Sequence, residues 1–308
     1  DEYTAVVDNN VYTNLMAQAN LRSAAESAAR HLEVARELDV SDGEIASWRH
    51  AAEAMFIPYD EAVGVHPQDQ DFMTHERWDF RSTPADHYPL MFHYSYFDLY
   101  RKQVVKQADL VFALYLRSAS FSAEEKRRDF DYYEGVTVRD SSLSACIQAI
   151  VAAEVGHLSL AHDYLAEAAF LDLHDLTDNV RSGLHIASLS GAALAIIAGF
   201  GGLRDDGDQI SFSPRLPDSL NRVAFRVTFG GNTLCVEITP EGVTYSSREE
   251  GAALRFFHSG EEVDLAPGAT QVKSLPRLES LVAPEQPAHR APIPRSRQAG
   301  STTSDDRS

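Results

Sequence analysis

Residues 184–203, LHIASLSGAALAIIAGFGGL, form the most apolar run of this 308-residue chain. A membrane span has about this length, roughly 20 residues. However, His185, Ser188 and Ser190 interrupt the run, and one arginine flanks each end, so no charge asymmetry sets an orientation. The high density of glycine and alanine suits a tightly packed buried helix. The run therefore predicts a helical core and no membrane span.

This run closes a series of helical segments that extends from residue 1 to about residue 204. Apolar residues at helical spacing predict helices at Asn10–Leu38, Asp42–Phe56, Tyr94–Leu116, Ser122–Tyr133, Ser141–Val155, Leu158–Leu171 and Leu184–Gly199. Gly156 and Gly201 stand where helix C-caps are expected. Between the helices, Tyr59–Tyr88 has no clear period, but its aromatic side chains favour an ordered loop.

The pattern of apolar residues changes after Asp208. Short β-branched or aromatic runs predict strands at Gln209–Phe212, Arg222–Phe229, Thr233–Thr239, Gly242–Tyr245, Ala253–Phe257 and Glu262–Leu265, with a hairpin turn at residues 230–232, GGN. These strands indicate a small antiparallel β domain. From about Pro276 the chain has too few large apolar groups to offset its ordering entropy. The sequence therefore predicts helices over residues 1–205, a β domain over 206–275 and a disordered tail over 276–308.

The formal net charge of −19 argues against nucleic acid or an anionic membrane as the main partner, because both attract basic surfaces. It leaves phosphate and neutral sugars open, because a local pocket can differ in sign from the whole surface. Cys146 and Cys235 are isolated thiols outside any metal-binding spacing, so we expect a reducing, cytoplasmic environment and no metal site. No signal peptide is present, although the chain begins at Asp1 without Met, so a targeting signal can lie before it.

Three groups of motifs stand out. They are residues 1–4 (DEYT) with 7–14 (VDNNVYTN), residues 106–111 (KQADLV) with 132–144 (YYEGVTVRDSSLS), and residues 183–188 (GLHIAS) with 199–202 (GFGG). In order and spacing they resemble glycoside hydrolase family 65, from Asp1 to about Pro267. The resemblance implies a mainly α fold with a small β domain. The chain is similar to the second half of an (α/α)6 barrel followed by a C-terminal antiparallel β-sandwich.

Glu2 is the residue that the resemblance implies as the general acid. Cleaving a glycosidic bond requires protonation of a poor leaving group, which a carboxylic acid with a raised pKa provides. Taken alone, a glutamate at this position is more often a solvated charge. Lys106 and Gln107 resemble the family pair that binds the glucose of the −1 subsite. Taken alone, they would suit an exposed helix face equally well.

Ser141, Ser142, His185 and Ser188 resemble the positions at which family phosphorylases hold phosphate. The two serines open an apolar helix, whose N–H groups and hydroxyls can bind an anion, and His185 and Ser188 open another helical run. Without the resemblance, the two serines are more simply helix N-caps, and His185 a core histidine. With it, we expect these residues to converge across the −1 sugar from the acid.

The first hypothesis is therefore inverting phosphorolysis of an α-linked glucosyl disaccharide to β-glucose 1-phosphate and a free sugar. Inorganic phosphate is then a co-substrate, and no cofactor is needed. Trehalose, maltose, kojibiose and nigerose all stay open as the disaccharide, and a homodimer stays open as the assembly. The loop at residues 66–69 (HPQD) and Trp78 could border the acceptor sugar, although a packed loop aromatic is the commoner case.

Two other hypotheses compete with phosphorolysis. An inverting α-glucoside hydrolase of the trehalose or kojibiose type would need a carboxylate base, for which Glu134 and Asp140 are the candidates. A non-catalytic part that binds carbohydrate, or only packs against the rest of the enzyme, is the third. We expect the 308 residues alone to be inactive, because half a barrel lacks half of its walls.

Overall fold

The computed structural model describes residues 1–176, 180–205, 209–277 and 281–292. Their contacts divide the chain into two compact units, unit 1 (Asp1–Val136) and unit 2 (Thr137–Ser308). The predicted helical and β domains meet inside unit 2. No helix in the described ranges combines the length and the hydropathy that crossing a membrane requires.

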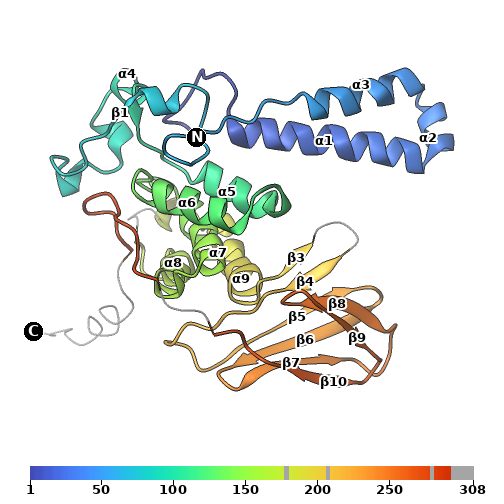
Figure 1. The fold of residues 1–308 in the computed structure, drawn as a ribbon. Helices are drawn as coiled ribbons and strands as arrows, with labels where there is room; N and C mark the ends of the chain where they lie inside the picture. Colours follow the sequence, from blue (N-terminus) through green and yellow to red (C-terminus); the bar gives the residue numbers. More distant parts are fainter. Residues whose placement is uncertain (177–179, 206–208, 278–280, 293–308) are drawn as a thin grey trace, which may run out of the picture. The chain divides into compact units, whose positions relative to one another are not determined.

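Unit 1 is helical, with a long connecting loop. Its elements are α1 (Val11–Arg30), α2 (Leu32–Glu37), α3 (Asp42–Glu53), η1 (Phe72–Thr74), β1 (Glu76–Arg77), η2 (Ala85–His87), η3 (Leu90–Phe92), α4 (Tyr96–Leu99), β2 (Lys102–Gln103), α5 (Asp109–Leu116), η4 (Ser118–Ser120) and α6 (Ala123–Glu134). Figure 1 shows α1 and α3 packed side by side as a hairpin. Asn10 caps α1 by accepting from the Thr13 N–H, and Ser41 caps α3 by accepting from the Glu44 N–H.

Two predicted helices of unit 1 are interrupted. The segment expected to be one helix over Asn10–Leu38 breaks at His31, whose backbone is not helical (φ −121°, ψ 59°). The segment expected over Tyr94–Leu116 is helical only in α4 and α5, because β2 lies between them and pairs in parallel with β1. Val105 follows β2, is fully buried and donates to the Val136 carbonyl at 2.9 Å. The extended backbone here places Lys106 and Gln107 in a turn before α5 instead of on a helix face.

Unit 2 begins with three helices. Its elements are α7 (Ser144–Val155), α8 (Leu158–Phe170), η5 (Val180–Ser182), α9 (Ile186–Leu194), the π-helical turn η6 (Ala195–Phe200), β3 (Arg204–Asp205), β4 (Ile210–Phe212), β5 (Val223–Phe229), β6 (Asn232–Thr239), β7 (Gly242–Ser247), β8 (Leu254–His258), β9 (Glu261–Leu265) and β10 (Thr270–Lys273). Gly156 ends α7 in the left-handed conformation (φ 102°), which confirms its predicted C-cap role. Gly201 ends η6, but its φ of −71° is right-handed.

The β domain is a sandwich of two sheets with strand orders β10-β7-β6-β5 and β3-β4-β8-β9 (Figure 1). Gly230 and Gly231, both at positive φ, form the predicted hairpin turn between β5 and β6. Aromatic rings join the sheets, with the centroids of Tyr245 and Phe256 4.8 Å apart. Three features were not predicted: the two-residue strand β3, the strand β10, whose four residues alternate only weakly in burial, and the parallel pairing of β4 with β8.

The tail differs from the predicted disorder over part of its length. In the segment 281–292, Pro287 and Pro292 are buried, and Gln286 donates to the hydroxyl of Tyr164 at 2.6 Å. Composition predicted disorder because the segment contains few large apolar groups. Here polar hydrogen bonds and buried prolines provide the contacts instead. Residues 278–280 and 293–308 lie outside the described residues.

Candidate active site

Glu2 lies in the turn that precedes α1, close to the turn that precedes α5. Lys106 Nζ donates to Glu2 Oε2 at 2.6 Å, across 104 positions of sequence. The Glu2 backbone N–H donates to the side-chain oxygen of Gln107 at 3.3 Å. The Lys106 side chain is only 8% exposed, whereas that of Glu2 is 53% exposed. The three predicted residues of the acid and −1 subsite therefore lie together, with the carboxyl group open to solvent.

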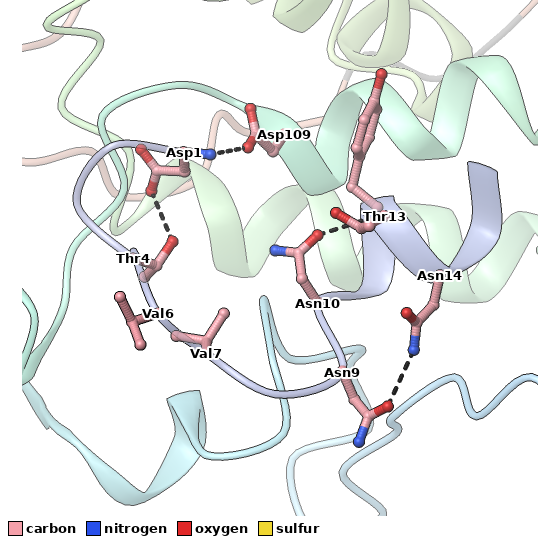
Figure 2. A pocket seen from close by; sticks show the side chains of 10 residues that line it. Asp1, Thr4, Val6, Val7, Asn9, Asn10, Thr13, Asn14 and Asp109 are labelled. Atoms are coloured by element: carbon pink, nitrogen blue, oxygen red, sulfur yellow. Dashed lines mark hydrogen bonds and ion pairs between the residues drawn. The ribbon is translucent and has the colours of Figure 1, made fainter. Parts of the chain in front are cut away.

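Asp1 holds these residues in place. Its Oδ1 accepts backbone hydrogen bonds from Lys106 (3.1 Å), Gln107 (3.3 Å) and Tyr3 (3.3 Å). The Thr4 hydroxyl donates to Asp1 Oδ2 at 3.3 Å, as Figure 2 shows. One carboxylate thus binds the backbone on both sides of the Glu2–Lys106 contact. Sequence reasoning missed this role, although Asp1 stands next to Glu2 in the motif.

A cavity of about 550 Å³ opens beside Asp1 (Figure 2). It is lined by Asp1, Thr4, Val6, Val7, Asn9, Asn10, Tyr12, Thr13, Asn14 and Asp109. The lining amides are fixed by the motif itself, since the Asn14 side chain donates to Asn9 Oδ1 at 3.2 Å. The first motif therefore builds a concave surface on which amide, hydroxyl and carboxylate groups lie beside apolar ones.

The loop candidates for the acceptor side have structural partners. His66 Nδ1 and its backbone N–H both lie 2.8 Å from the carboxylate of Asp129, which is fully buried in α6. Burial raises the pKa of Asp129, against the lowering effect of the His66 hydrogen bond. Trp78 donates to the Thr83 hydroxyl at 2.9 Å and packs edge-on against Tyr94. These contacts show how the loop is anchored, and they favour the packing role for Trp78.

In unit 2, Ser141 and Ser142 precede α7 without capping it. The helix begins at Ser144, and Leu143 occupies the N-cap position with no side-chain hydrogen bond to the helix. Ser141 Oγ accepts from the Leu143 N–H at 3.3 Å. The N-cap alternative is therefore wrong for both serines. No side chain at the cap satisfies the first N–H groups of α7, which are the groups that could meet an anion.

His185 occupies the N-cap position of α9 and is held by Asp172. The His185 backbone N–H donates to Asp172 Oδ2 at 2.9 Å, and Nδ1 lies 2.6 Å from Asp172 Oδ1. The hydrogen bond from His185 lowers the pKa of Asp172. Because Nδ1 faces Asp172, Nε2 is the ring nitrogen available for another partner. Asp172 is a second residue that the sequence did not reveal, because it lies outside the quoted motifs.

Ser188, unlike His185, has no accessible side chain. The residue is 1% exposed, and its hydroxyl donates to the Ala168 carbonyl of α8 at 3.3 Å. One turn into α9, its position faces the neighbouring helix. The structure therefore places Ser188 in the α8–α9 packing, although the resemblance grouped it with His185.

Helices α7 and α9 begin at the same end of their bundle. A Cβ on Gly191 would lie 2.4 Å from Cys146 Sγ, so only glycine allows α9 to approach α7 here. Farther along, in η6, which follows α9 directly, a Cβ on Gly199 would lie 3.3 Å from the Ile150 Cα. The contacts advance along both helices in the same order, so the helices run in parallel. Ser141 and Ser142 before α7, and His185 before α9, are thereby brought to one end of the bundle.

The two carboxylates proposed as alternative bases are both buried. Glu134, in α6, is 1% exposed. The Asp140 side chain has no exposed surface, and its Oδ1 lies 3.3 Å from the guanidinium of Arg290. Activating a water requires a carboxylate that the water can reach. Neither residue presents one in the described structure.

Residues 1–194 match the glycosyl hydrolase family 65 central catalytic domain, and residues 203–265 match the C-terminal domain of that family. An uncharacterised glycosyl hydrolase of Mycobacterium tuberculosis is 48% identical over 299 residues, which are 96% of this chain and 38% of that protein. The α,α-trehalose phosphorylase of Geobacillus stearothermophilus is 42% identical over 250 residues, covering 79% of this chain and 33% of the relative. A solved structure provisionally named a kojibiose phosphorylase, from the human microbiome, has a TM-score of 0.79 at 26% identity and covers 89% of this chain and 37% of that chain.

Helical hairpins followed by an antiparallel β-sandwich define the class, which is the second half of an (α/α)6 barrel with its C-terminal β domain. The chain belongs to glycosyl hydrolase family 65. The predicted resemblance and fold class are thereby confirmed. The chain spans 33% to 38% of the length of the two curated relatives described above.

Proposed function

We propose that this chain serves an inverting phosphorolysis of an α-linked glucosyl disaccharide, which yields β-glucose 1-phosphate and a free sugar. The observation that carries the proposal is the contrast between the carboxyl groups. Glu2 is exposed, so a substrate can reach its carboxyl group, whereas both candidate bases, Glu134 and Asp140, are buried. An inverting hydrolase needs an acid and an accessible base, whereas a phosphorylase needs only the acid, because phosphate is itself the nucleophile.

In the proposed reaction, Glu2 gives its proton to the glycosidic oxygen, and the bond from C1 to that oxygen breaks. A phosphate oxygen forms a new bond to C1 from the opposite face, which inverts the configuration. Lys106 and Gln107 hold the glucosyl unit. Ser141, Ser142, His185 and the first N–H groups of α7 supply donors to phosphate. Ser188 supports α9 from within its packing. The proposal requires the starts of α7 and α9 to face Glu2 across the sugar.

Trehalose is the first disaccharide to test, because a trehalose phosphorylase is among the relatives with the higher identity. The full-length protein is incubated with trehalose, maltose, kojibiose or nigerose, with and without inorganic phosphate. We expect cleavage of one sugar only when phosphate is present, and a β-anomeric glucose 1-phosphate signal by NMR. Equal cleavage without phosphate would establish the hydrolase instead. Cleavage of none of the four would contradict the proposal.

A further inference from the structure

The segment 281–292 lies beyond residue 265, where the match to the family's C-terminal domain ends, and it returns to the helices of unit 2. At its start, Leu281 lies beside Gly156, the residue that ends α7. A Cβ on Gly156 would be 3.4 Å from Leu281 Cδ1. In the middle, Gln286 bonds to Tyr164 of α8. Near its end, Arg290 reaches the turn that precedes α7. The segment therefore runs antiparallel to α7, towards the predicted phosphate motif.

Arg290 closes the turn formed by residues 138–140. Its guanidinium donates to the carbonyl of Val138 and, at 2.9 Å, to the carbonyl of Arg139. The Arg139 guanidinium in turn donates to the Arg290 carbonyl, so the two arginines bind each other's backbone. Arg139 has a φ of +54°, in the left-handed region that residues other than glycine rarely adopt. These bonds hold Arg139 in that conformation, directly before Asp140 and Ser141.

The charges of this cluster balance in pairs. Arg139 lies 3.3 Å from Glu167, and its guanidinium also packs over the ring of Tyr164. Arg290 lies 3.3 Å from Asp140, whose side chain has no exposed surface. A buried carboxylate without a cation would place an uncompensated negative charge beside Ser141 and Ser142. Such a charge disfavours the approach of an anion.

We propose that Arg290 is a positioning residue of the phosphate site. It neutralises Asp140 and fixes the turn from which Ser141 and Ser142 project. The inference rests on the proposed function, and it extends that function to a segment outside both matched family domains. Arg290 acts through Asp140 and through the backbone, and it needs no contact with phosphate itself.

The test compares Arg290→Gln with Arg290→Lys in the full-length protein. Loss of the charge in R290Q should raise the KM for phosphate about tenfold, while the KM for the disaccharide changes less than twofold. R290K keeps the charge and should recover most of the affinity for phosphate. In an Asp140→Asn background, R290Q should raise the phosphate KM far less, because the charge that Arg290 offsets is gone. Arg255→Gln is the matched control, since Arg255 pairs with Asp264 on the exposed surface of β8 and β9.

The outcomes separate this inference from the proposed function. A wild-type protein that cleaves without phosphate overturns both. Phosphate-dependent cleavage with an unchanged phosphate KM in R290Q overturns only the role of Arg290. If Arg290 had a merely structural role, R290Q would lower the melting temperature and raise the KM values for phosphate and disaccharide together. It would do so equally in the Asp140→Asn background. If R290Q does not fold, the R290K single variant and the D140N/R290Q double variant decide, since each lacks an unpaired charge.

Discussion

Around Glu2, groups that lie 104 to 106 positions apart in the sequence hold one another. At the starts of α7 and α9, by contrast, the candidate phosphate side chains bond to near neighbours: Ser141 Oγ to a group 2 positions away and His185 Nδ1 to one 13 positions away. The turn before Ser141 has one distant support, Arg290, which lies 151 positions from its partner Arg139. The acid site is therefore a joint product of two distant motifs. The anion site consists of two helix starts with separate supports, Arg290 at the first and Asp172 at the second. We infer that variants at the first site should change kcat, and that variants at the second should change the KM for phosphate.

The largest effect is expected at Glu2. Glu2→Gln keeps the size of the side chain but cannot give a proton to the leaving oxygen, so kcat should fall by at least about a thousandfold. Steady-state phosphorolysis by the full-length protein measures it. Glu53→Gln, on an exposed position of α3, is the matched control. Turnover of E2Q close to that of the control would exclude Glu2 as the acid.

A variant of Asp1 tests whether catalysis depends on the bonds that join the first motif to the turn at Lys106 and Gln107. In Asp1→Asn, one oxygen that accepts hydrogen bonds becomes an NH2 group, so the turn at Lys106 and Gln107 loses part of its support. We expect kcat to fall about thirtyfold with little change in the KM for phosphate. Asp86→Asn, at an exposed position of η2, serves as the control. A larger change in the phosphate KM than in kcat would contradict the division between the two sites.

The fold could be predicted where one periodicity extends over a whole element. The helix α8 and the β5–β6 hairpin satisfy this condition, and the structure confirms them. The predicted helix over Tyr94–Leu116 failed because side-chain pattern does not report backbone partners. Its middle is held extended by pairing of β2 with β1, which lies 26 residues earlier. The segment 281–292 escaped prediction for a related reason, since its order depends on hydrogen bonds from Gln286 and Arg290 to distant groups.

The candidate site could be predicted only as far as the motifs reach. Glu2, Lys106 and Gln107 lie together as the resemblance implied. Asp1, which positions them, lies within the first motif. Asp172 and Arg290, which support the phosphate candidates, lie outside every quoted motif and act through contacts that no spacing encodes. Ser188 shows the opposite case, in which a residue inside a motif is engaged in helix packing.

The anion site is tested first at His185. His185→Ala removes the imidazole ring, whose Nε2 is available beside the start of α9. The proposed hydrogen bond from Nε2 to the charged phosphate is lost with it. We expect the KM for phosphate to rise about tenfold, more than the KM for the disaccharide. His50→Ala, on an exposed turn of α3, controls for loss of a histidine. Equal changes in both KM values would remove His185 from the phosphate site.

The smallest effect is expected at Asp172, which contacts only His185 in this site. Asp172→Asn replaces one of two accepting oxygens, so either the ring or the backbone N–H of His185 loses its acceptor. The phosphate KM should rise about fivefold, with kcat nearly unchanged. A KM that rises as much as in H185A would mean that Asp172 contributes more than orientation of the ring.

The pH dependence of stability provides an independent check on the same pair. The pKa of Asp172 is lowered from 3.8 by the hydrogen bond from His185. A carboxyl group whose pKa is depressed by folding stabilises the protein above its unfolded pKa, and this contribution is lost as the pH falls through the folded pKa. The wild type should therefore melt at a higher temperature than Asp172→Asn at pH 7, and the gap should narrow once the pH falls below 3.8 and close as the pH passes through the lowered pKa. Asp218→Asn, at an exposed position, should show no such gap. A gap that does not narrow as the pH falls below 3.8 would show that the charge of Asp172 is not what holds His185.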